Sequence, residues 1–166
     1  MRWNDLSDVA CSVARATSVV GDRWTLLVLR DCFMGIRRFE DFERRLGIAR
    51  PVLSQRLKKL VAEGVLERVR YEERPARYEY RLTAMGRDLY PVIRTLTAWG
   101  DKYLMEEQGP PVLTRHRGCG HVVTPVLTCP ECGEPVTARD MIAEPGPGAV
   151  GISHIPASAG KRPSNG

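Results

Sequence analysis

The sequence RPVLSQRLKKLVAEG, residues 50–64, decides how the rest of the chain is interpreted. Apolar residues recur in it at the spacing of one helical face: Leu53, Leu57, Leu60 and Val61. The opposite face carries polar, cationic or small residues: Pro51, Gln55, Lys58, Lys59 and Ala62. Proline is tolerated in the first turn of a helix, and glycine, here Gly64, often ends one. Such a helix either packs on a protein surface or reads DNA.

A second, shorter helix is predicted directly before this stretch, from FEDFERRL at residues 39–46. Phe39, Phe42 and Leu46 share one face, and Gly47 ends the helix. Two helices joined by a tight turn, the second with a basic outer face, have the layout of a helix-turn-helix. In that layout the second helix lies in the major groove, so DNA binding becomes a serious alternative to packing alone.

Two further helices are predicted upstream. The first runs from about Leu6 to Val20 and ends at Gly21. The next, RWTLLVLRDCFM, is capped by Asp22 and is apolar around most of its circumference. A helix that is apolar all round is usually central and buried.

Downstream of the opening stretch the pattern changes to the alternation typical of strands. We predict short strands at residues 65–69 and 78–82, joined by the polar loop RYEERPAR into a β-hairpin wing. Arg74 and Arg77 lie at its predicted tip. They either contact DNA phosphates or are solvated and paired with the neighbouring glutamates, as weak exposed ion pairs are.

A last helix is predicted over residues 83–107, capped by Thr83 and kinked or divided at Pro91. It carries an apolar stripe near heptad spacing: Leu89, Ile93, Leu96, Trp99 or Gly100, and Tyr103. The stripe exceeds what one small winged domain buries, so we expect a homodimer on a two-fold operator. The alternative is packing of the stripe against the first helix of the same chain.

Charge and composition narrow the function class. Residues 1–105 carry 20 Lys and Arg against 14 Asp and Glu, and residues 37–81 alone carry 13 cations and 8 acids. A local cationic surface attracts polyanions such as DNA. No run of 18 apolar residues exists, and the N-terminus lacks the basic start of a signal peptide, so we expect a cytoplasmic protein. No nucleophile–base pair or open metal site can be assembled, so we do not expect an enzyme.

The order of elements and many residues resemble the HxlR-type winged helix-turn-helix transcription regulators, relatives of the MarR type. The matching pieces span roughly residues 8–104: CSVARA (11–16), GDRWTLLVLR (21–30), GIRRFEDF (35–42), LGIA (46–49), LSQRLKKL (53–60), GVLER (64–68), RPARYEYRLT (74–83) and Gly86. The resemblance implies a homodimer that binds double-stranded operator DNA and regulates transcription, with an effector that the sequence does not identify.

Two positions within the matching pieces bear on this resemblance. The family often has Ser or Thr where Ala49 stands, and alanine cannot supply the side-chain cap, which costs about 0.5–2 kcal/mol of helix stability. Cys11 matches a cysteine that is a thiol sensor in some members. We favour a buried, inert cysteine, because a redox sensor needs exposure and a cationic neighbour, for which Arg15 is the candidate.

The expected DNA contacts follow from this reading of the helix-turn-helix and wing. Residues near the start of the second helix are the candidates for base edges: Arg50, Pro51, Ser54, Gln55 and Arg56. Glutamine pairs bidentately with adenine, so Gln55 is the natural reader of that base. Cations farther along the helix and in the wing are expected on phosphates, which position the protein without reading sequence: Lys58, Lys59, Arg74 and Arg77.

The C-terminal part carries a different motif. His116 and Cys119 stand in HxxCG, and Cys129 and Cys132 stand in CxxCG. In a cytosolic chain such a cluster is better read as metal-binding than as a disulfide framework. Four nitrogen and sulfur ligands suit a closed tetrahedral zinc site, and the pattern resembles a zinc ribbon, so we expect one structural zinc per chain. His121 is the alternative fourth ligand, and a degenerate ribbon without metal is the alternative to the site.

The predicted fold is therefore mainly α with a small β-hairpin wing, a short C-terminal zinc-ribbon-like β piece and a disordered tail. The predicted boundaries are 1–105 for the DNA-binding and dimerisation domain, 106–111 for a linker, 112–143 for the ribbon and 144–166 for the tail. The predicted function is sequence-specific transcription regulation. The alternative is a zinc-ribbon protein–protein adaptor that uses the winged domain as a dimer scaffold.

Overall fold

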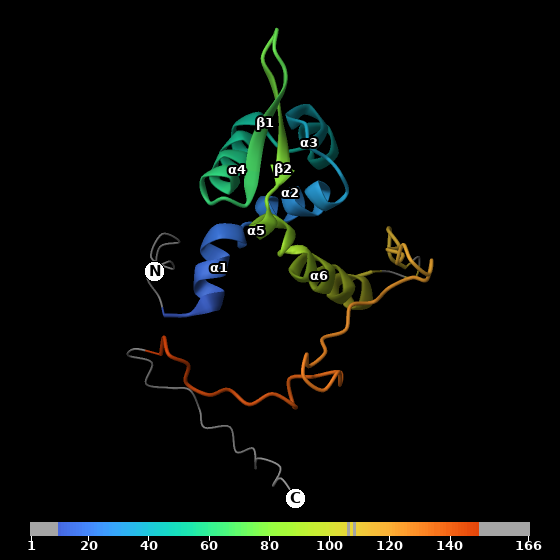
Figure 1. Ribbon diagram of the computed structural model, residues 1–166. Helices are drawn as coiled ribbons and strands as arrows, with labels where there is room; N and C mark the ends of the chain where they lie inside the picture. The colour runs from blue at the N-terminus through green and yellow to red at the C-terminus, as the bar shows by residue number, and fades with distance from the viewer. Residues whose placement is uncertain (1–9, 106, 108, 150–166) are drawn as a thin grey trace, which may run out of the picture.

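A computed structural model describes residues 10–105, 107 and 109–149 of the 166-residue chain. The elements in order are α1 (Ser12–Val20), α2 (Arg23–Phe33), α3 (Phe39–Leu46), α4 (Arg50–Ala62), β1 (Leu66–Glu72), β2 (Arg77–Leu82), α5 (Ala84–Arg87) and α6 (Tyr90–Tyr103). The helices gather around the base of the two-stranded hairpin, which projects away from them (Figure 1). This confirms the predicted class, mainly helical with a β-hairpin wing. Within the described residues, no helix is long and apolar enough to cross a membrane.

The helix-turn-helix is bounded by the predicted signals. Oδ1 of Asp22 accepts hydrogen bonds from the amides of Trp24 and Thr25, which caps the first turn of α2. Gly47 ends α3 in the left-handed conformation, with φ at 59°, and α4 begins three residues later. Ala49 gives α4 no side-chain cap, as the sequence predicted.

One hydrophobic core lies beneath the helix-turn-helix. Its buried members come from α2, α3, the turn after α3, α4, the start of the hairpin and α6: Val28, Leu29, Phe42, Ile48, Leu53, Leu57, Leu60, Val65, Leu66 and Ile93. Helix α2 packs against α3, α4 and α6, so it occupies the centre, as predicted. Helix α4 is therefore fixed to the body through its leucine face.

A buried carboxylate ties α2 to α3. Asp31 is fully buried, with Arg30 at 2.8 Å and Nε of Arg45 at 3.4 Å from its oxygens. Both arginines remain partly exposed, so the charge of Asp31 is neutralised from the surface side. Removing one partner of such a buried pair is usually costly, and the cluster therefore fixes the angle between the two helices.

The wing is longer than predicted and is anchored at its base. β1 and β2 pair antiparallel from Leu66–Leu82 to Glu72–Arg77, with an irregularity between Arg70 and Glu72. The segment before α3 pairs with β2 through one isolated antiparallel bridge, Arg38–Glu79, where the amide of Tyr80 donates to the carbonyl of Arg37 at 2.8 Å. Strand alternation alone did not predict this bridge, which joins the wing to the start of α3.

The last helical region is divided, as the proline predicted. α5 is capped by the hydroxyl of Thr83, which accepts from the amide of Gly86 at 3.1 Å, and α6 begins one residue before Pro91. Gly86 leaves no room for a side chain, since a Cβ there would lie 2.1 Å from the carbonyl oxygen of Val65. α6 ends at Tyr103, so it is shorter than the predicted 83–107.

The predicted first helix begins later than expected in the described part of the chain. α1 starts at Ser12 with Cys11 as its N-cap residue, and residues 1–9, which include the predicted start at Leu6, lie outside the described residues. Most of the predicted tail, residues 150–166, also lies outside them.

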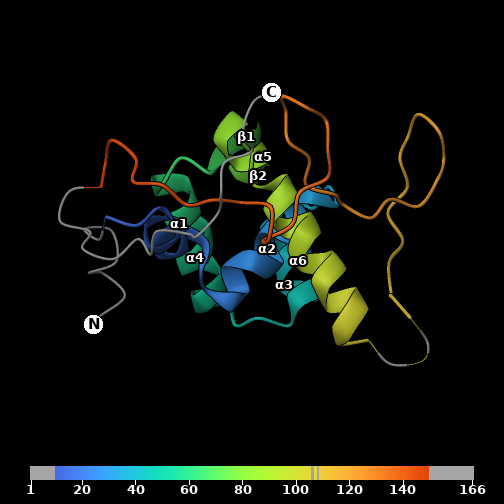
Figure 2. The ribbon, with the colours of Figure 1, turned by 90° about the horizontal axis from the view of Figure 1, so that it is seen from below.

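Residues 109–149 form an open C-terminal segment with no helix or strand. Two isolated β-bridges, Arg115–Val122 and Thr128–Pro135, are what the structure shows of the predicted β piece. No residue of this segment is buried. It leaves the end of α6 and runs toward the side of the molecule that holds α1 (Figures 1 and 2), and Arg94 of α6 donates to the carbonyl of Val123 at 3.3 Å.

Candidate nucleic-acid interface

The outward side of α4 is a narrow polar ridge, which we call the α4 crest. Its members are exposed and follow one line along the helix: Pro51, Gln55, Lys58 and Ala62. Leu53, Leu57 and Leu60 on the opposite side are fully buried. The structure thus places Gln55 and Lys58 facing solvent from a rigid helix, as predicted. A ridge with an amide and an ammonium group can enter a major groove and contact base edges and phosphates.

Two of the predicted contact residues turn away from the crest. Nε of Arg56 lies 2.9 Å from Oδ1 of Asp22, and the arginine side chain is only 23% exposed. Nζ of Lys59 donates to the backbone carbonyl of Ser18 at 2.5 Å. Both residues therefore hold α4 against the end of α1 and the start of α2. The leucine spacing predicted which face of α4 is buried. It did not predict that the flank with Arg56 and Lys59 contacts α1 and the start of α2.

Arg50 and Ser54 lie on the other flank of α4, toward α3. Nη1 of Arg50 is 2.6 Å from Oε2 of Glu43, and its guanidinium lies 4.9 Å from the ring centre of Phe39. Ser54 is half-buried beside it. Arg50 is thus oriented by α3 while it stays largely exposed at the start of the recognition helix, next to the crest.

The tip of the wing carries the exposed Arg74, while Arg77 stands at the start of β2. Nε of Arg77 lies 3.4 Å from Oε2 of Glu72, and both side chains are well exposed. Of the two alternatives predicted from the sequence, DNA contact or pairing with a glutamate, the structure shows Arg77 paired with Glu72. Such an exposed pair contributes little and can be exchanged for a phosphate contact.

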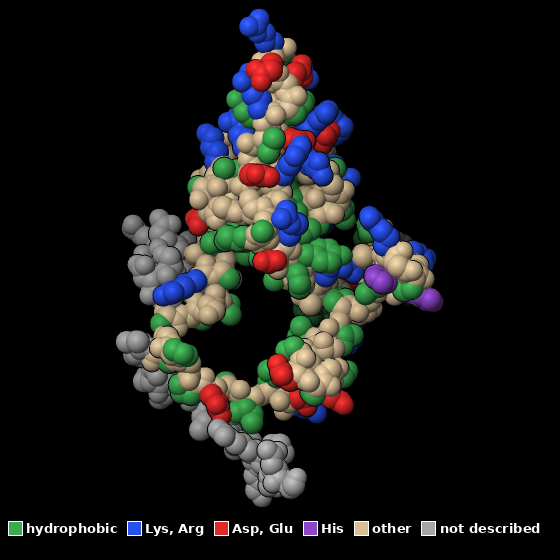
Figure 3. All heavy atoms as spheres, in the orientation of Figure 1, with side chains coloured by type: hydrophobic (Ala, Val, Ile, Leu, Met, Phe, Trp, Pro, Cys, Tyr) green, Lys and Arg blue, Asp and Glu red, His purple; other side chains and the backbone are tan. Residues whose placement is uncertain are grey.

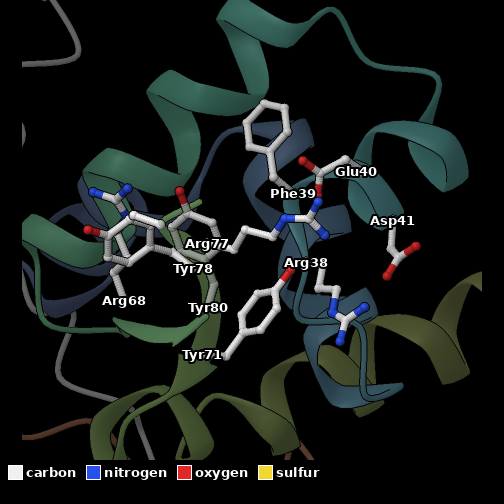
Figure 4. Close-up of a pocket in the computed structure, with 10 residues that line it drawn as sticks. Arg38, Phe39, Glu40, Asp41, Arg68, Tyr71, Arg77, Tyr78 and Tyr80 are labelled. Carbon is white, nitrogen blue, oxygen red and sulfur yellow. The ribbon is translucent and has the colours of Figure 1, made fainter. Parts of the chain in front are cut away.

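A cavity of about 540 Å³ lies between the wing and α3, and Figure 4 shows the side chains around it. Arg77 lines it together with two arginines that the sequence reasoning did not single out. The guanidinium of Arg38 lies 4.7 Å from the ring centre of Tyr71, and that of Arg68 lies 3.5 Å from the ring centre of Tyr78. The aromatic rings hold these cations in place, and Glu40 and Asp41 of α3 line the same cavity. The pair Arg37-Arg38 before α3 was the sequence signal for this site.

Charge and apolar surface are separated on the molecule. Lys and Arg side chains gather on the wing and around α3 and α4, whereas hydrophobic side chains gather at the opposite end over α5 and α6 (Figure 3). α6 exposes Leu96, Trp99 and Tyr103 by 49%, 54% and 59%. One end of the body is therefore suited to a polyanion and the other to an apolar partner.

The two cysteines of the winged body differ in environment. Cys11 is exposed, so the expectation that it is buried was wrong. It directly precedes α1, as the N-cap residue of that helix. Burial raises the pKa of the Cys32 thiol to about 12, and the charge of Asp31 adds to the shift, so this thiol stays protonated and inert.

The predicted metal-ligating residues form two separate pairs. Nδ1 of His116 lies 3.3 Å from Sγ of Cys119. In the second pair, the backbone amides of Cys132 and Glu131 and the Cys132 side chain hold the pKa of the Cys129 thiol below its usual range. The structure does not bring the pairs together: among the described residues, no three His, Cys, Asp or Glu side chains meet to hold a metal ion.

Comparison with known proteins agrees with this geometry. The model of the HxlR-like helix-turn-helix family matches residues 19–108. An HTH-type transcriptional regulator of Mycobacterium tuberculosis is 53% identical over 137 residues, which covers 82% of this chain and 87% of the relative. An HTH-type regulator of Bacillus subtilis, YdeP, is 34% identical over 94 residues, 56% of this chain and 73% of the relative.

Solved structures show the same resemblance. The crystal structure of the transcription factor PA1607 is similar with a TM-score of 0.76 and 34% identity, covering 83% of this chain and 96% of that chain. The reduced form of the redox regulator HypR has a TM-score of 0.53 and 30% identity, covering 55% of this chain and 92% of that chain. An aligned length of 137 residues exceeds residues 1–108, so the similarity to the mycobacterial relative continues into the C-terminal segment.

Proposed function

Since the chain belongs to the HxlR-like helix-turn-helix family and is a DNA-binding transcription regulator, we propose that it acts in the cytoplasm as a homodimer on an inverted-repeat operator. The observation that carries this proposal is the opposition of two surfaces. The α4 crest and the wing place cations at one end of the body, and α6 leaves an apolar stripe at the other. A polyanion and a second copy of the chain can therefore bind at the same time.

The α4 crest enters the major groove in this proposal. Gln55 faces outward at its middle and can accept and donate to one adenine, while Ser54 and Pro51 lie beside it. Lys58, one turn farther along, reaches a phosphate. Arg56 and Lys59 act by holding the helix at its angle, because their contacts with Asp22 and Ser18 occupy them.

The wing and the cavity between it and α3 contact the DNA backbone. Arg74 at the tip and Arg77 beside it provide the first phosphate contacts. Arg38 and Arg68 extend the same cationic surface toward α3, and both are positioned by tyrosine rings. Phosphate contacts fix the register of the protein on the duplex, so the wing positions the crest without reading sequence itself.

The second subunit is proposed to cover α6. Leu96, Trp99 and Tyr103 lie on one face of this helix and are about half exposed. An exposed apolar stripe of large side chains marks an interaction site, and a two-fold axis through it lets the same patch pair with itself. The two α4 helices would then enter successive major grooves about 34–36 Å apart. A ligand or oxidation that changes the angle between the two subunits would change affinity for the operator.

The adaptor alternative is not favoured. The relatives with 53% identity are named transcriptional regulators, and their similarity covers both the winged body and part of the C-terminal segment. Surplus positive charge is concentrated around the helix-turn-helix, with 13 cations and 8 acids in residues 37–81. A dimer scaffold for a protein adaptor has no need of that charge.

Selection of genomic fragments by the purified full chain tests DNA recognition. The enriched fragment should contain an inverted repeat and bind at near-physiological salt with a dissociation constant on the order of 10⁻⁸ M or tighter. Affinity should fall steeply as salt rises, because phosphate contacts release counterions. Failure to prefer any genomic fragment over random duplex would reject the proposal.

Charge insertion tests the subunit interface. Leu96→Glu or Trp99→Glu would bury an unpaired carboxylate between subunits and should convert the dimer to a folded monomer. Ala62→Glu is the matched control, because it puts the same charge on the exposed end of the α4 crest and should leave the dimer intact. Sedimentation of both α6 variants as unchanged dimers would remove α6 from the interface.

A further inference from the structure

The C-terminal segment contains one ten-residue backbone unit twice. Residues 114–123 and 127–136 are offset by 13 positions, and their backbone hydrogen bonds correspond one for one. In the first unit the amides of His116, Gly120 and Val123 donate to the carbonyls of His121, His116 and Thr114 at 2.9, 2.7 and 2.9 Å. In the second unit the amides of Cys129, Gly133 and Val136 donate to Glu134, Cys129 and Leu127 at 2.9, 2.8 and 2.9 Å.

The turn at the centre of each unit is also the same. Gly120 and Gly133 both adopt the left-handed conformation, with φ at 72° and 74°. The bridges Arg115–Val122 and Thr128–Pro135 close the two units at equivalent positions. Few side chains are shared between the units, and neither has a core. The repeat preserves the backbone turn and the two positions at which a histidine or cysteine side chain stands.

Each unit presents two metal-ligating side chains at equivalent positions. His116 corresponds to Cys129, and Cys119 corresponds to Cys132. Two ligands of a tetrahedral zinc ion, one nitrogen and one sulfur, lie about 3.6 Å apart, given the usual Zn–N and Zn–S lengths. The 3.3 Å between Nδ1 of His116 and Sγ of Cys119 is close to that separation. Each unit can thus supply two of the four ligands that a tetrahedral site needs.

The repeat also discriminates between the two histidines. His121 corresponds to Glu134, which follows the left-handed glycine and lies outside the turn. The backbone carbonyl of His121 closes the first unit by accepting from the amide of His116. His116 occupies the position that Cys129 has in the second unit, so His116 is the histidine that corresponds to a thiol ligand.

We propose that the two units of one chain close on each other around a single zinc ion, held by His116, Cys119, Cys129 and Cys132. Residues 124–126 act as the hinge, since only these three residues separate the units. Among the described residues the two pairs do not meet, so closure would have to bring all four side chains to one ion. With four protein ligands the ion has no open position, and its role is structural.

Closure would also cover apolar side chains that the open segment leaves in solvent. Val122, Val123 and Leu127 flank the hinge and Val126 lies in it, and all four are between 40% and 66% exposed. A pair of ten-residue units has too little apolar surface to fold unaided. The free energy of metal ligation can supply the difference, as it does in other small metal-dependent folds.

Zinc content of the full chain, purified under reducing conditions without chelator, is the first test. About one zinc per chain is expected in the parent and in His121→Ala, and close to none in Cys129→Ser and His116→Ala. A content near zero in the parent, also after addition of zinc chloride and removal of the excess, would overturn the site. Retention in His116→Ala with loss in His121→Ala would overturn the assignment of the fourth ligand.

Mixing two variants tests whether both units belong to the same site in one chain. The pair His116→Ala/Cys119→Ser removes the first unit, and Cys129→Ser/Cys132→Ser removes the second. Neither variant should bind zinc alone, and their mixture should remain free of it. Recovery of zinc in the mixture would show ligands shared between chains and would overturn closure within one chain. Far-ultraviolet circular dichroism on each variant checks that the helical body, which contains none of these residues, stays folded.

Discussion

The winged body and the C-terminal segment are stabilised in opposite ways. Ten buried hydrophobic residues hold the helices of the body to the base of the wing. Residues 109–149 contain no buried residue, and their order comes from short-range backbone hydrogen bonds within two small turns. Hydrophobic burial suffices where several packed helices and a hairpin can enclose side chains. A segment that cannot enclose any must obtain stability from something that binds it.

The largest difference is expected from the same truncation made in each region. Leu57→Ala removes a fully buried side chain from α4 and should lower the free energy of unfolding by about 2–5 kcal/mol. Leu127→Ala removes a side chain that is 66% exposed and should change it by less than about 0.5 kcal/mol. Denaturant unfolding followed by circular dichroism measures both. Equal effects would mean that the segment shares the core of the body.

Removal of metal should act on the segment alone. If zinc closes the two units, a chelator should open them and expose the arginines at 115, 117 and 139 to trypsin. The body should resist cleavage, because its core needs no metal, and operator affinity should stay within about twofold of its original value. Timed proteolysis with and without chelator gives the result. Loss of operator binding on chelation would contradict the separation of the two regions.

Recognition of bases should depend on the winged body, and on Gln55 more than on any other side chain of α4. Gln55→Ala should cost about 1–3 kcal/mol of operator affinity and relax base preference at one position. A panel of single base substitutions in the operator measures this. Arg56→Ala is the informative comparison, since its contact with Asp22 predicts a loss of stability and no change in base preference. A change in base preference in Arg56→Ala and none in Gln55→Ala would show that α4 presents a different face when it is bound to DNA.

Backbone contacts should give a smaller and uniform effect. Arg77→Ala should weaken binding to all duplexes alike and reduce the slope of log affinity against log salt by about one. Arg87→Ala serves as control, because this side chain donates to the carbonyl of Leu82 on the side of the body away from the wing tip. A change in base preference on loss of Arg77 would contradict a contact with phosphate only.

The last prediction compares the reactivity of the two cysteine thiols of the winged body, and its effect is the smallest. Iodoacetamide should modify the exposed Cys11 and leave Cys32 unmodified near pH 8. A thiol whose pKa is raised to about 12 is protonated at that pH, and the thiolate is the nucleophile. Mass spectrometry of the modified peptides measures both. Modification of Cys32 as fast as Cys11 would show that α2 is less tightly packed than the structure describes.

Local sequence signals predicted most of the body. Asp22 capped α2 with its carboxylate, Gly47 ended α3, and Pro91 divided the last helical region, because each acts on the backbone of its immediate neighbours. The leucine spacing in residues 50–64 identified the buried face of α4. These signals depend on a few neighbouring residues, so one sequence is enough to interpret them.

The sequence did not predict features that depend on distant residues. Arg56 and Lys59 were expected at the DNA, but their partners Asp22 and Ser18 lie in other elements. The pairing of Arg37 with Tyr80 and the exposure of Cys11 are likewise set by which elements meet. In the C-terminal segment the sequence showed the spacing of the histidine and cysteine residues, whereas the matching hydrogen bonds of the two units needed coordinates.

The direct test of recognition by the body is a titration of the full chain against its best genomic fragment and a shuffled duplex of equal composition. At near-physiological salt the fragment should bind two chains with a dissociation constant on the order of 10⁻⁸ M or tighter, and at least about a thousandfold more tightly than the shuffled duplex. Equal affinity for both duplexes would contradict sequence-specific regulation by the α4 crest.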